Sequence, residues 1–586
     1  MSDRAVREFE RWEARVTDPE LTAELQSMRA QLDAGDATAV EDAFFQDLEF
    51  GTGGLRGMLG AGSNRMNVHT VAQATQGLAD YLNAHFENPS VAVAHDSRNK
   101  GELFCETVAG VLAANGVKAH LYPRLEPTPA LSFATRDLGC SAGINVTASH
   151  NPAAYNGYKV YGPDGCQITT QAAHDIQAAI AAVDMFGGVK SMAFADAVES
   201  GLASYIEEGT LDRFVDAVAA SSQHVEAPSD GDDLKLVYTP LNGTGMECVG
   251  RILERIGVRD VTVVPEQAEP NGDFPTCPYP NPEIREALEL GLKLTEDLGA
   301  DLLLATDPDA DRVGIAVHHG GEDVLLTGNE VGVLLTDWLA ERAAAKGEDV
   351  GQKVVVSTIV STSMLDALAA ERGFELRRTL TGFKYIGEQI GLLEAAGQAD
   401  RHLFGFEESY GYLAGTHVRD KDAVVASMLI CEMARDYKAR GMDLVDAMNA
   451  LYERLGYYRN LTVSLSYPGA DGAAQMKAIM ERLRAQTPAE VARLAVEAVV
   501  DYASGAPMPV VGAACTSACE ACGQPQTLPA ANVFELQLAG GNKLIVRPSG
   551  TEPKIKAYVF AKGATPQEAD ALTGAIEAAA RELLGA

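Results

Sequence analysis

A strand–helix–strand unit that occurs three times constrains the fold of this chain more than any other feature. Each copy runs from a short β-branched apolar segment, through small polar residues, into apolar positions at helical spacing. The expected helices stop at Gly116, Gly257 and Gly373, where a left-handed cap needs no Cβ atom. Apolar strands joined by helices form parallel sheets covered on both faces. We therefore expect three similar α/β domains with mixed, mainly parallel sheets. The copies begin at Val91, Leu234 and Lys353.

The sequence from about Gly456 onward has a different character. An extended run is followed by two expected helices, around Met476–Arg484 and Pro488–Val499, then by short apolar strands and a last helix from Pro566. Strands and helices in this order are typical of a smaller α+β domain. We place the four domains at residues 1–207, 208–320, 321–455 and 456–586.

Length and charge limit the classes of function. The 586 residues suit about four domains of ordinary size. The 47 basic and 82 acidic residues give a net charge of −35, which disfavours nucleic acid and anionic membrane as partners. An anionic ligand therefore needs a local basic pocket. The charged N-terminal segment and the lack of a long apolar stretch predict a cytoplasmic protein without membrane contact.

Nine cysteines, an odd number, are too few for a disulfide scaffold, so we interpret them as reduced thiols. Three of them, Cys515, Cys519 and Cys522, are clustered in a segment rich in Ala, Gly and Pro. Their spacing fits an iron–sulfur site, but no fourth Cys and no His is near. A loop insertion or an adventitious zinc site are the alternatives that we keep.

Ser149 follows an apolar run and lies in the segment Thr147-Ala148-Ser149-His150-Asn151-Pro152. A serine at the end of a buried strand, on a loop stiffened by proline, can present its hydroxyl in a crevice. His150 is adjacent, but neighbouring side chains of an extended segment point to opposite faces, which argues against His150 as the base for Ser149. An ordinary loop serine is the alternative.

Asp307, Asp309 and Asp311 follow a second apolar run and fall on one side of an extended chain. Three carboxylates this close repel one another unless a cation neutralises them. Oxygen ligands favour a hard ion, and Mg²⁺ is the usual choice beside phosphate. A calcium loop is excluded because Arg312 and His318 stand where Gly and Glu are required. A solvated acidic turn is the alternative.

Four further loops carry polar groups suited to anions or sugars. Arg547-Pro548-Ser549-Gly550-Thr551 combines a guanidinium, hydroxyls and a glycine, the parts of a phosphate cradle. The acidic segment at 405–411 offers acceptors for sugar hydroxyls. The segments at 381–385 and 51–57 each combine glycine with one basic residue. Each of these loops could also be an ordinary surface turn.

Together, these motifs resemble a known family. TASHNP, DPDADR, FEESYG and RPSGTEPK occur in unbroken order between Phe50 and Ala557. The chain resembles the α-D-phosphohexomutases, the phosphoglucomutase/phosphomannomutase family, and is most similar to its phosphoglucomutase and phosphopentomutase branch. The resemblance implies three similar α/β domains and a fourth, smaller domain around a central cleft.

The resemblance also implies roles for individual residues. Ser149 becomes the phosphoserine, and Ser149 with Asp307, Asp309 and Asp311 would hold one Mg²⁺ per chain. Some family members have a histidine in the sugar loop, at the position after Ser-Gly, but this chain has Ser409-Tyr410-Gly411, so that role cannot be transferred. The expected catalytic residues are Ser149, His150, Lys159, Lys384 and Arg56, with Lys384 and His150 as candidates for proton transfer. The expected substrate-binding residues are Arg312, Thr381, Gly382, Glu407, Ser409, Arg547, Ser549, Gly550 and Thr551.

The implied activity is the reversible conversion of glucose 1-phosphate to glucose 6-phosphate, with a sugar bisphosphate as intermediate and activator. Phosphopentomutase and phosphomannomutase activities are alternatives, as is a sugar-phosphate binding protein without turnover. A binding protein needs no nucleophile beside a metal site, so Ser149 and the aspartates favour the enzyme. The fourth domain, which carries Arg547, is expected to close over the substrate. We expect sugar phosphates as partners and a monomer or a homodimer.

Overall fold

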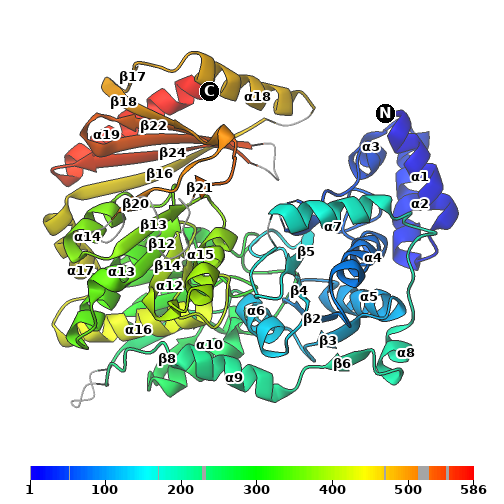
Figure 1. Ribbon diagram of the computed structural model, residues 1–586, viewed down its shortest axis with the longest axis horizontal. Coiled ribbons are helices and arrows are strands. Elements are labelled where there is room, and N and C mark those ends of the chain that lie inside the picture. The colour runs from blue at the N-terminus through cyan, green and yellow to red at the C-terminus, as the bar shows by residue number, and fades with distance from the viewer. Residues whose placement is uncertain are drawn as a thin grey trace. The chain divides into compact units, whose positions relative to one another are not determined.

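The fold is that of a computed structural model, which describes residues 2–51, 53–168, 170–227, 233–467, 470–511, 527–549 and 554–585 (Figure 1). The chain divides into two units. Unit 1 comprises Met1–Leu325 and His417–Glu432, and unit 2 comprises Leu326–Thr416 and Met433–Ala586.

Three helices precede the first sheet of unit 1: α1 (Asp3–Arg15), α2 (Pro19–Asp33) and α3 (Thr38–Phe44). Ser2 caps α1 and Asp18 caps α2, whose first residue is a proline, so each start follows the usual preferences for a helix N-terminus. The helices enclose a small aromatic core in which Trp12 meets Phe44 edge-on. This helical segment was not predicted separately from the first α/β domain.

The first sheet has strand order β1-β5-β4-β2-β3-β6. Strand β2 pairs in parallel with β3 and β4, whereas β5 runs antiparallel to β4 and β1. The strands are β1 (Gly54–Met58), β2 (Ser90–His95), β3 (Lys118–Leu121), β4 (Ala142–Val146), β5 (Tyr155–Tyr161) and β6 (Ala203–Tyr205). The helices are α4 (Val68–His85), α5 (Gly101–Ala114), α6 (Thr128–Asp137), α7 (Thr170–Ala182), α8 (Phe194–Glu199) and α9 (Glu208–Ala219).

The second sheet of unit 1 has order β11-β10-β9-β7-β8, with a parallel centre and β10 antiparallel to β9. Strand β11 joins this sheet, although its residues fall beyond the predicted domain boundary at residue 320. The strands are β7 (Lys235–Thr239), β8 (Asp260–Val263), β9 (Leu302–Thr306), β10 (Val313–His319) and β11 (Glu322–Leu326). The helices are α10 (Gly245–Arg255), α11 (Pro265–Ala268) and α12 (Arg285–Leu298).

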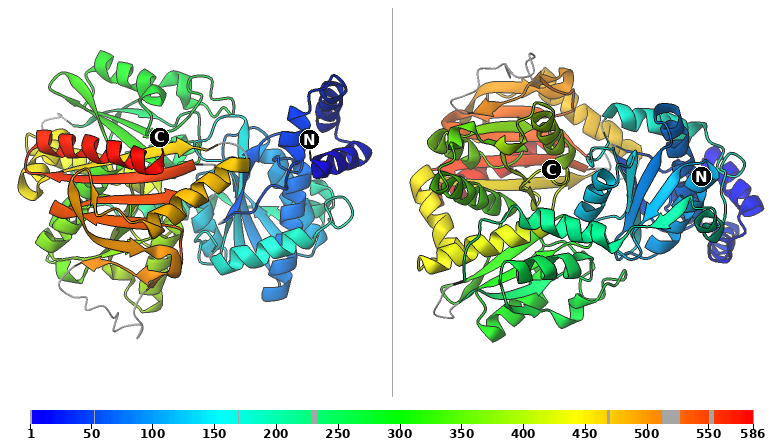
Figure 2. Two further views of the ribbon diagram at one scale, coloured as in Figure 1. Left: turned by 90° about the horizontal axis from the view of Figure 1, so that it is seen from above. Right: turned by 60° about the horizontal axis from the view of Figure 1, so that its bottom comes forward.

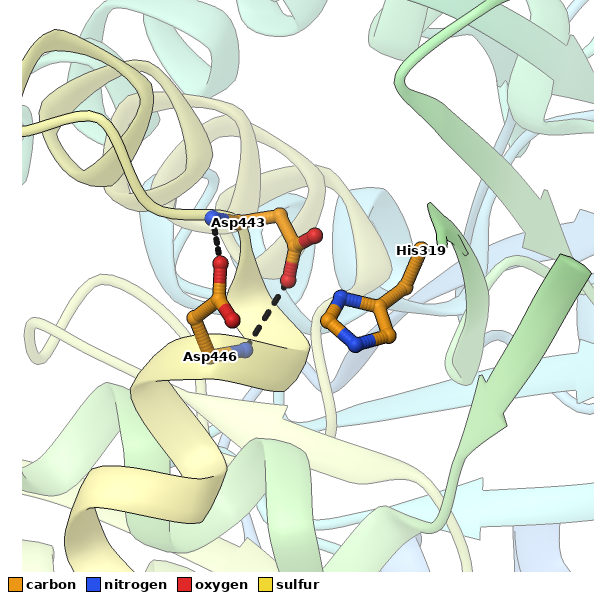
Figure 3. A group of neighbouring side chains, drawn as sticks. All are labelled: His319, Asp443 and Asp446. Atoms are coloured by element: carbon orange, nitrogen blue, oxygen red, sulfur yellow. Dashed lines mark hydrogen bonds between the residues drawn. The ribbon is translucent and has the colours of Figure 1, made fainter. Parts of the chain in front are cut away.

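The third sheet lies in unit 2 and has order β15-β14-β12-β13-β20. Asp443 caps α17, with reciprocal hydrogen bonds between Asp443 and Asp446 (Figure 3). The strands are β12 (Val354–Thr358), β13 (Glu375–Thr379), β14 (His402–Glu407), β15 (Gly411–Leu413) and β20 (Val510–Val511). The helices are α13 (Gly328–Ala345), α14 (Met364–Arg372), α15 (Phe383–Ala395), α16 (Ala423–Ala439) and α17 (Leu444–Leu455), with 3₁₀ turns at Val350–Gln352 and Ala399–Arg401.

The fourth sheet is antiparallel throughout, in the order β16-β24-β23-β22-β18-β17. Helices α18 (Ala470–Ala485) and α19 (Pro566–Leu584) contribute to one core with this sheet, and Figure 2 shows α19 along it. The strands are β16 (Tyr457–Ser466), β17 (Glu490–Val491), β18 (Leu494–Asp501), β22 (Phe534–Leu538), β23 (Asn542–Pro548) and β24 (Lys554–Gly563). A small ribbon pairs β19 (Ala506–Pro507) with β21 (Thr527–Leu528), and 3₁₀ turns lie at Tyr502–Ser504 and Ala539–Gly541.

The helix predicted at Pro488–Val499 is wrong: the segment forms the hairpin of β17 and β18. Ala492 and Arg493 turn the chain with φ values of 53° and 64°, and β18 then pairs with β22. The spacing of the Ala, Glu and Val residues in this stretch is compatible with a helix and with a strand. Pairing with a neighbouring strand therefore decided the outcome, as tertiary context often does for such segments.

The repeated units are confirmed as β2–α5–β3, β7–α10–β8 and β12–α14–β13. Gly116, Gly257 and Gly373 follow the three helices with φ values of 75°, 72° and 86°, the left-handed conformation expected of a glycine stop. Each of these three sheets has a parallel centre and at least one antiparallel edge. The predicted α/β class with a smaller α+β domain is confirmed.

Within unit 2 the third and fourth sheets share a hydrophobic core. Ile359, Val360 and Leu380 from the third domain pack with Tyr558 and Phe560 of β24. Strand β20, which lies between β18 and β22 in the sequence, pairs with β13 of the third sheet. The fourth domain is therefore joined to the third by both a shared core and a strand.

Among the described residues, no helix has the length and apolar character needed to cross a membrane. The cysteines that the structure describes, at 105, 140, 166, 248, 277 and 431, are buried, and none of them forms a disulfide. Cys515, Cys519 and Cys522 lie outside the described residues.

Candidate active site

Ser149 lies in unit 1, three residues past the end of β4, on a loop with unusual backbone geometry. Ser149 is only 3% exposed, and its backbone φ of +52° lies in the left-handed region. For a residue other than glycine this conformation costs roughly 1 to 3 kcal/mol and needs support from its surroundings. Part of the support is a 2.8 Å hydrogen bond from the Ser149 amide to the Thr147 hydroxyl. Gly157 of β5 passes so close that a Cβ there would lie 2.4 Å from the Thr147 carbonyl oxygen.

The Ser149 hydroxyl faces two titratable groups. Ser149 Oγ donates a 2.8 Å hydrogen bond to Asp307 Oδ2, and His150 Nδ1 lies 3.1 Å from Ser149 Oγ. The expectation that Ser149 and His150 point to opposite faces is therefore wrong. That rule holds for extended backbone, and the left-handed Ser149 breaks the alternation.

The loop that follows β9 carries the three aspartates. Asp307, Asp309 and Asp311 are buried, and one carboxylate oxygen of each lies within 4.8 Å of the others. The loop turns at Ala310, which has a φ of 48°. Gly243 packs against it so tightly that a Cβ would lie 2.4 Å from Pro308 Cα. The spacing in the sequence thus becomes a cluster of carboxylates at the end of the strand.

Two lysines balance part of the negative charge. Lys159 of β5 lies 2.8 Å from Asp309 Oδ2 and 3.3 Å from Asp311 Oδ2, and Lys421 lies 3.1 Å from Asp311 Oδ2. Burial and the two neighbouring aspartates raise the pKa of Asp307 well above its usual range. Burial opposes the charged form of Asp309 as well, but the Lys159 ammonium and the Thr128 hydroxyl hold the pKa of Asp309 below its usual value.

The carboxylate cluster fits a hard cation. Asp309 Oδ1 and Asp311 Oδ1 are buried and have no hydrogen-bond partner within the part of the chain that the structure describes. Arg312 Nε lies 3.7 Å from Asp311 Oδ1. Buried carboxylate oxygens in this state are costly, and an oxygen-coordinated divalent ion would satisfy them.

Arginines and His150 surround the same loop. Arg56 of β1 lies 3.3 Å from Asn151 Oδ1, and Arg312 pairs with Glu283 at 2.8 Å. Burial first, and then the charges of Arg312 and Arg56, lower the pKa of His150 well below its usual value. His150 is therefore a neutral imidazole around pH 7.

The sugar-loop residues lie in unit 2, where β14 ends at Glu407. Glu407 Oε1 accepts a 2.7 Å hydrogen bond from the Gly382 amide, which brings two predicted substrate residues together. The neighbouring Glu408 accepts hydrogen bonds from the hydroxyls of Thr358, at 3.1 Å, and Ser361, at 3.2 Å. Gly328 lets α13 approach this loop, since a Cβ there would lie 2.3 Å from the Glu408 carbonyl oxygen.

Other predicted residues of unit 2 lie around these contacts. Thr381 and Ser409 are half-buried, and the Lys384 ammonium lies 5.2 Å from the centre of the Tyr385 ring. Arg547 is the last residue but one of β23 and is half-buried. Ser549 is also half-buried, and its amide donates to the Lys554 carbonyl at 2.7 Å. Gly550 and Thr551 lie outside the described residues.

Tyr558 connects the sugar loop with Arg547 electrostatically. Burial and the charge of Glu408 raise the pKa of Tyr558, Arg547 acts in the opposite direction, and Glu407 adds to the increase. Glu407, Glu408 and Arg547 therefore share one electrostatic environment within unit 2.

Several residues of the site escaped the sequence analysis. Thr128 donates to Asp309 Oδ2 at 2.8 Å, Lys421 pairs with Asp311, and the buried Arg98 contacts the carbonyl of Ser149. Lys421 stands in the charged run Arg419-Asp420-Lys421-Asp422, which could have marked it. Arg98 follows the buried strand β2, as the aspartates follow the buried strand β9, and this position after a strand was its signal.

Comparison with protein families gives three matches along the chain. Domain I of phosphoglucomutase/phosphomannomutase matches residues 47–185, domain II matches 212–321, and domain III matches 327–455. The chain belongs to the phosphoglucomutase/phosphomannomutase family. The resemblance inferred from the motifs is thereby confirmed, and the chain is a phosphosugar mutase of that family.

Curated relatives extend over most of the chain. It is 34% identical over 513 residues to a phosphoglucomutase of Staphylococcus epidermidis, covering 87% of this chain and 90% of the relative. It is also 34% identical over 525 residues to a phosphoglucomutase of Staphylococcus aureus, covering 89% of this chain and 91% of the relative. Both relatives support the phosphoglucomutase branch of the family.

Solved structures of the family have the same fold. A phosphoglucomutase/phosphomannomutase family protein of Burkholderia thailandensis matches with a TM-score of 0.64 and 17% identity, over 92% of this chain and 97% of that one. The open form of parafusin, a phosphoglucomutase from Paramecium, also gives a TM-score of 0.64 and 17% identity, over 92% of this chain and 94% of that one.

Proposed function

We propose that this mutase is a phosphoglucomutase that interconverts glucose 1-phosphate and glucose 6-phosphate, with Ser149 as the phosphoryl carrier. The observation that carries the proposal is the 2.8 Å hydrogen bond from Ser149 Oγ to Asp307, inside a cluster of buried carboxylates. A protein that only binds sugar phosphates needs neither a buried nucleophile nor such a cluster. The relatives named phosphoglucomutases favour glucose as the sugar.

The proposed reaction transfers a phosphoryl group twice. The bond between Ser149 Oγ and phosphorus breaks and a bond forms from phosphorus to a free hydroxyl oxygen of the sugar monophosphate. The proton of that hydroxyl passes to a base, and Ser149 Oγ takes up a proton to become a free hydroxyl. The resulting bisphosphate turns and returns its other phosphoryl group to Ser149. Water takes no part, so no inorganic phosphate is released.

Ser149 and the three aspartates are the groups that we propose to hold Mg²⁺. Their donors are all oxygen atoms, as this ion prefers, and Asp309 Oδ1 and Asp311 Oδ1 are the unsatisfied oxygens that it would engage. When bound, the ion supplies positive charge that neutralises phosphoryl oxygens. Lys159 keeps Asp309 ionised and in place, and Lys421 forms an ion pair with Asp311 at 3.1 Å.

His150 and Lys384 are the proposed proton carriers. His150 is neutral, and its Nδ1 lies 3.1 Å from Ser149 Oγ, so it can receive a proton at the transfer site. Lys384, in unit 2, is the candidate for the sugar hydroxyl. Arg56 and Arg312 add positive charge near the Ser149 loop, where an incoming phosphate needs it.

Unit 2 is proposed to recognise the substrate. Glu407, Ser409, Thr381 and Gly382 would bind sugar hydroxyls, with the Glu407–Gly382 hydrogen bond fixing the two loops relative to each other. Arg547 and Ser549, together with Gly550 and Thr551, would bind the phosphate that is not being transferred.

A panel of sugar 1-phosphates tests the choice of substrate. We expect glucose 1-phosphate to give the highest kcat/KM, ahead of mannose, glucosamine and ribose 1-phosphates. Faster turnover of ribose or mannose 1-phosphate would replace glucose by that sugar. Binding of all four without turnover of any would support the binding protein instead.

Glu407→Ala in the same panel tests the proposed sugar contact. A buried acceptor that loses its hydroxyl partner costs about 1 to 3 kcal/mol, so the variant should reduce the preference for glucose roughly 10- to 100-fold. Glu371→Ala, which removes an exposed carboxylate paired with Arg454 in unit 2, should leave the preference unchanged. An unchanged preference in Glu407→Ala would place sugar selection elsewhere.

We further propose that the enzyme works in the cytoplasm, where the buried cysteines stay reduced, as a monomer or a homodimer. Size-exclusion chromatography with light scattering would decide between the two assemblies.

A further inference from the structure

Arg98 holds the Ser149 loop by its backbone. The residue lies in the turn after β2 and is only 3% exposed. Its guanidinium donates to the carbonyl of Ser149 at 2.5 Å, of Pro152 at 2.9 Å and of Tyr155 at 3.0 Å, and also to that of Asn151. One side chain therefore satisfies carbonyl groups along the whole loop from Ser149 to β5.

Asp96 completes the arrangement from the same turn. Its Oδ1 accepts the Arg98 amide at 2.9 Å, and its Oδ2 accepts the Thr147 hydroxyl at 2.5 Å. Thr147 in turn accepts the Ser149 amide at 2.8 Å. The Arg98 Nε lies 3.4 Å from Asp96 Oδ2, so the guanidinium and the carboxylate form a buried ion pair. Arg98 contacts the Ser149 carbonyl, and Asp96 supports the Ser149 amide through Thr147.

The Arg98 guanidinium is itself fixed in orientation. Its carbon lies 5.1 Å from the centre of the Phe274 ring, a cation–π contact from the second domain of unit 1. A planar fork of donors held in this way can satisfy several carbonyls at once, which an ammonium group cannot do with the same geometry. The left-handed conformation of Ser149 is strained, so the loop relaxes if these contacts are lost.

We infer that Arg98 is a positioning residue for phosphoryl transfer, holding Ser149 Oγ in line with Asp307 through the backbone carbonyls of the loop. This inference rests on the proposed function, because it assigns Arg98 a role in transfer to and from Ser149. Among the described residues, Arg98 forms no hydrogen bond to the Ser149 hydroxyl or to the carboxylates of Asp307, Asp309 and Asp311. It therefore acts through the backbone of the Ser149 loop.

Single-turnover transfer tests the inference. Wild-type enzyme and variants are labelled on Ser149 with ³²P, mixed with glucose 6-phosphate, and the label that reaches the sugar is followed over time. In Arg98→Met the transfer rate at saturating sugar should fall about 100-fold, because a displacement of about 1 Å at the reacting atom has effects of this size. The sugar concentration for half-maximal rate should change less than twofold.

Two further variants separate positioning from general stability. Arg98→Lys keeps the charge but not the planar fork, and should remain at least tenfold slower than wild type. Val249→Ala removes buried volume on α10 of the same unit, remote from these hydrogen bonds, and should lower Tm without slowing transfer measured below its Tm. If Arg98→Met fails to fold, Asp96→Asn, which weakens the same pair, should slow transfer with an unchanged half-saturating concentration.

The ³¹P resonance of phospho-Ser149 provides a second readout. In wild type we expect one narrow line, and in Arg98→Met a broadened or divided line, because the loop then samples several conformations. A folded Arg98→Met with a wild-type transfer rate and line would overturn the inference and leave the proposed function standing. A wild-type enzyme that passes no label to the sugar would overturn the proposed function itself.

Discussion

The two units of the chain carry different kinds of chemistry. Unit 1 holds a buried hydroxyl, three buried carboxylates and the ammonium groups of Lys159 and Lys421 in direct contact. Unit 2 holds the half-buried Ser409 and Arg547 with Glu407 beside a backbone amide. The first set can make and break a covalent bond, whereas the second can bind hydroxyls and phosphate.

The difference shows which unit holds the strained backbone and the buried charges of the proposed transfer site. Unit 1 buries charges and strains Ser149, and both are tolerated because neighbouring groups fix them in place. Unit 2 offers the half-buried Ser409 and Arg547 together with the buried carboxylate of Glu407. Substitutions in unit 1 should therefore lower kcat, and substitutions in unit 2 should raise KM or change the choice of sugar.

The largest expected effect follows from the nucleophile. Ser149→Ala should fold normally and lose roughly four to six orders of magnitude in kcat, because no other group can carry the phosphoryl. Steady-state kinetics measure the loss. Ser204→Ala, at the exposed β6 of the same unit, is the control and should keep full activity. Activity in Ser149→Ala within tenfold of wild type would contradict the assignment of phosphoryl transfer to unit 1.

Metal removal should come next in size. Chelation should abolish turnover and added Mg²⁺ should restore it, and Asp309→Asn should lower kcat roughly 100- to 1,000-fold while raising the Mg²⁺ concentration needed. Titration of activity against free Mg²⁺ measures both quantities. Full turnover of the chelated enzyme would mean that the buried aspartates are structural and that unit 1 works without an ion.

Arg547→Ala tests the other side of the comparison. Losing a charge-assisted contact worth about 1.5 to 3 kcal/mol should raise KM roughly 10- to 100-fold while phospho-Ser149 still forms. More sugar bisphosphate should also escape into solution, where it can be assayed enzymatically. An unchanged KM without added release would remove the fourth domain from substrate binding.

The smallest effect concerns stability, through Glu126 of unit 1. Burial raises the pKa of Glu126 to about 8, despite the Arg124 guanidinium at 3.1 Å. The folded state then holds a proton that the unfolded state has lost, so the free energy of unfolding should fall by about 1 to 3 kcal/mol between about pH 5.5 and pH 7.5. Urea denaturation at several pH values measures this slope.

Glu126→Gln should flatten the slope and stabilise the protein at the higher pH, because the amide stays neutral. Glu208→Gln removes an exposed partner of the same Arg124 and should change the slope little. An identical slope in wild type and Glu126→Gln would show that this carboxylate stays ionised in the folded protein.

The sequence predicted those features that depend on local patterns. Gly116 and its two counterparts marked helix ends because a left-handed residue is a local requirement. The expected cluster of Asp307, Asp309 and Asp311 is present, but it forms through a turn at Ala310 and not on one side of an extended chain. The β17–β18 hairpin was missed because a segment rich in Ala and Val can form a helix or a strand, and here pairing with β22 decides between them. The N-terminal helices lay outside every recognised motif.

The contacts of the site were harder to predict than its motifs. The prediction for His150 assumed an extended backbone. Ser149 instead has a positive φ, which local composition does not reveal, and His150 Nδ1 therefore lies 3.1 Å from the Ser149 hydroxyl. Arg98 and Lys421 reach the site from other elements of unit 1, over separations in sequence of 51 and 110 residues. The expected closure of the fourth domain must also accommodate the core that it shares with the third.

The central claim is that Ser149 carries the phosphoryl group between sugars. Intact mass and phosphopeptide mapping, after mixing the enzyme with glucose 1,6-bisphosphate and then with glucose 6-phosphate, test it most directly. We predict one phosphate on Ser149, lost mole for mole to the sugar without release of inorganic phosphate. Phosphate at another residue, or release as inorganic phosphate, would contradict the claim.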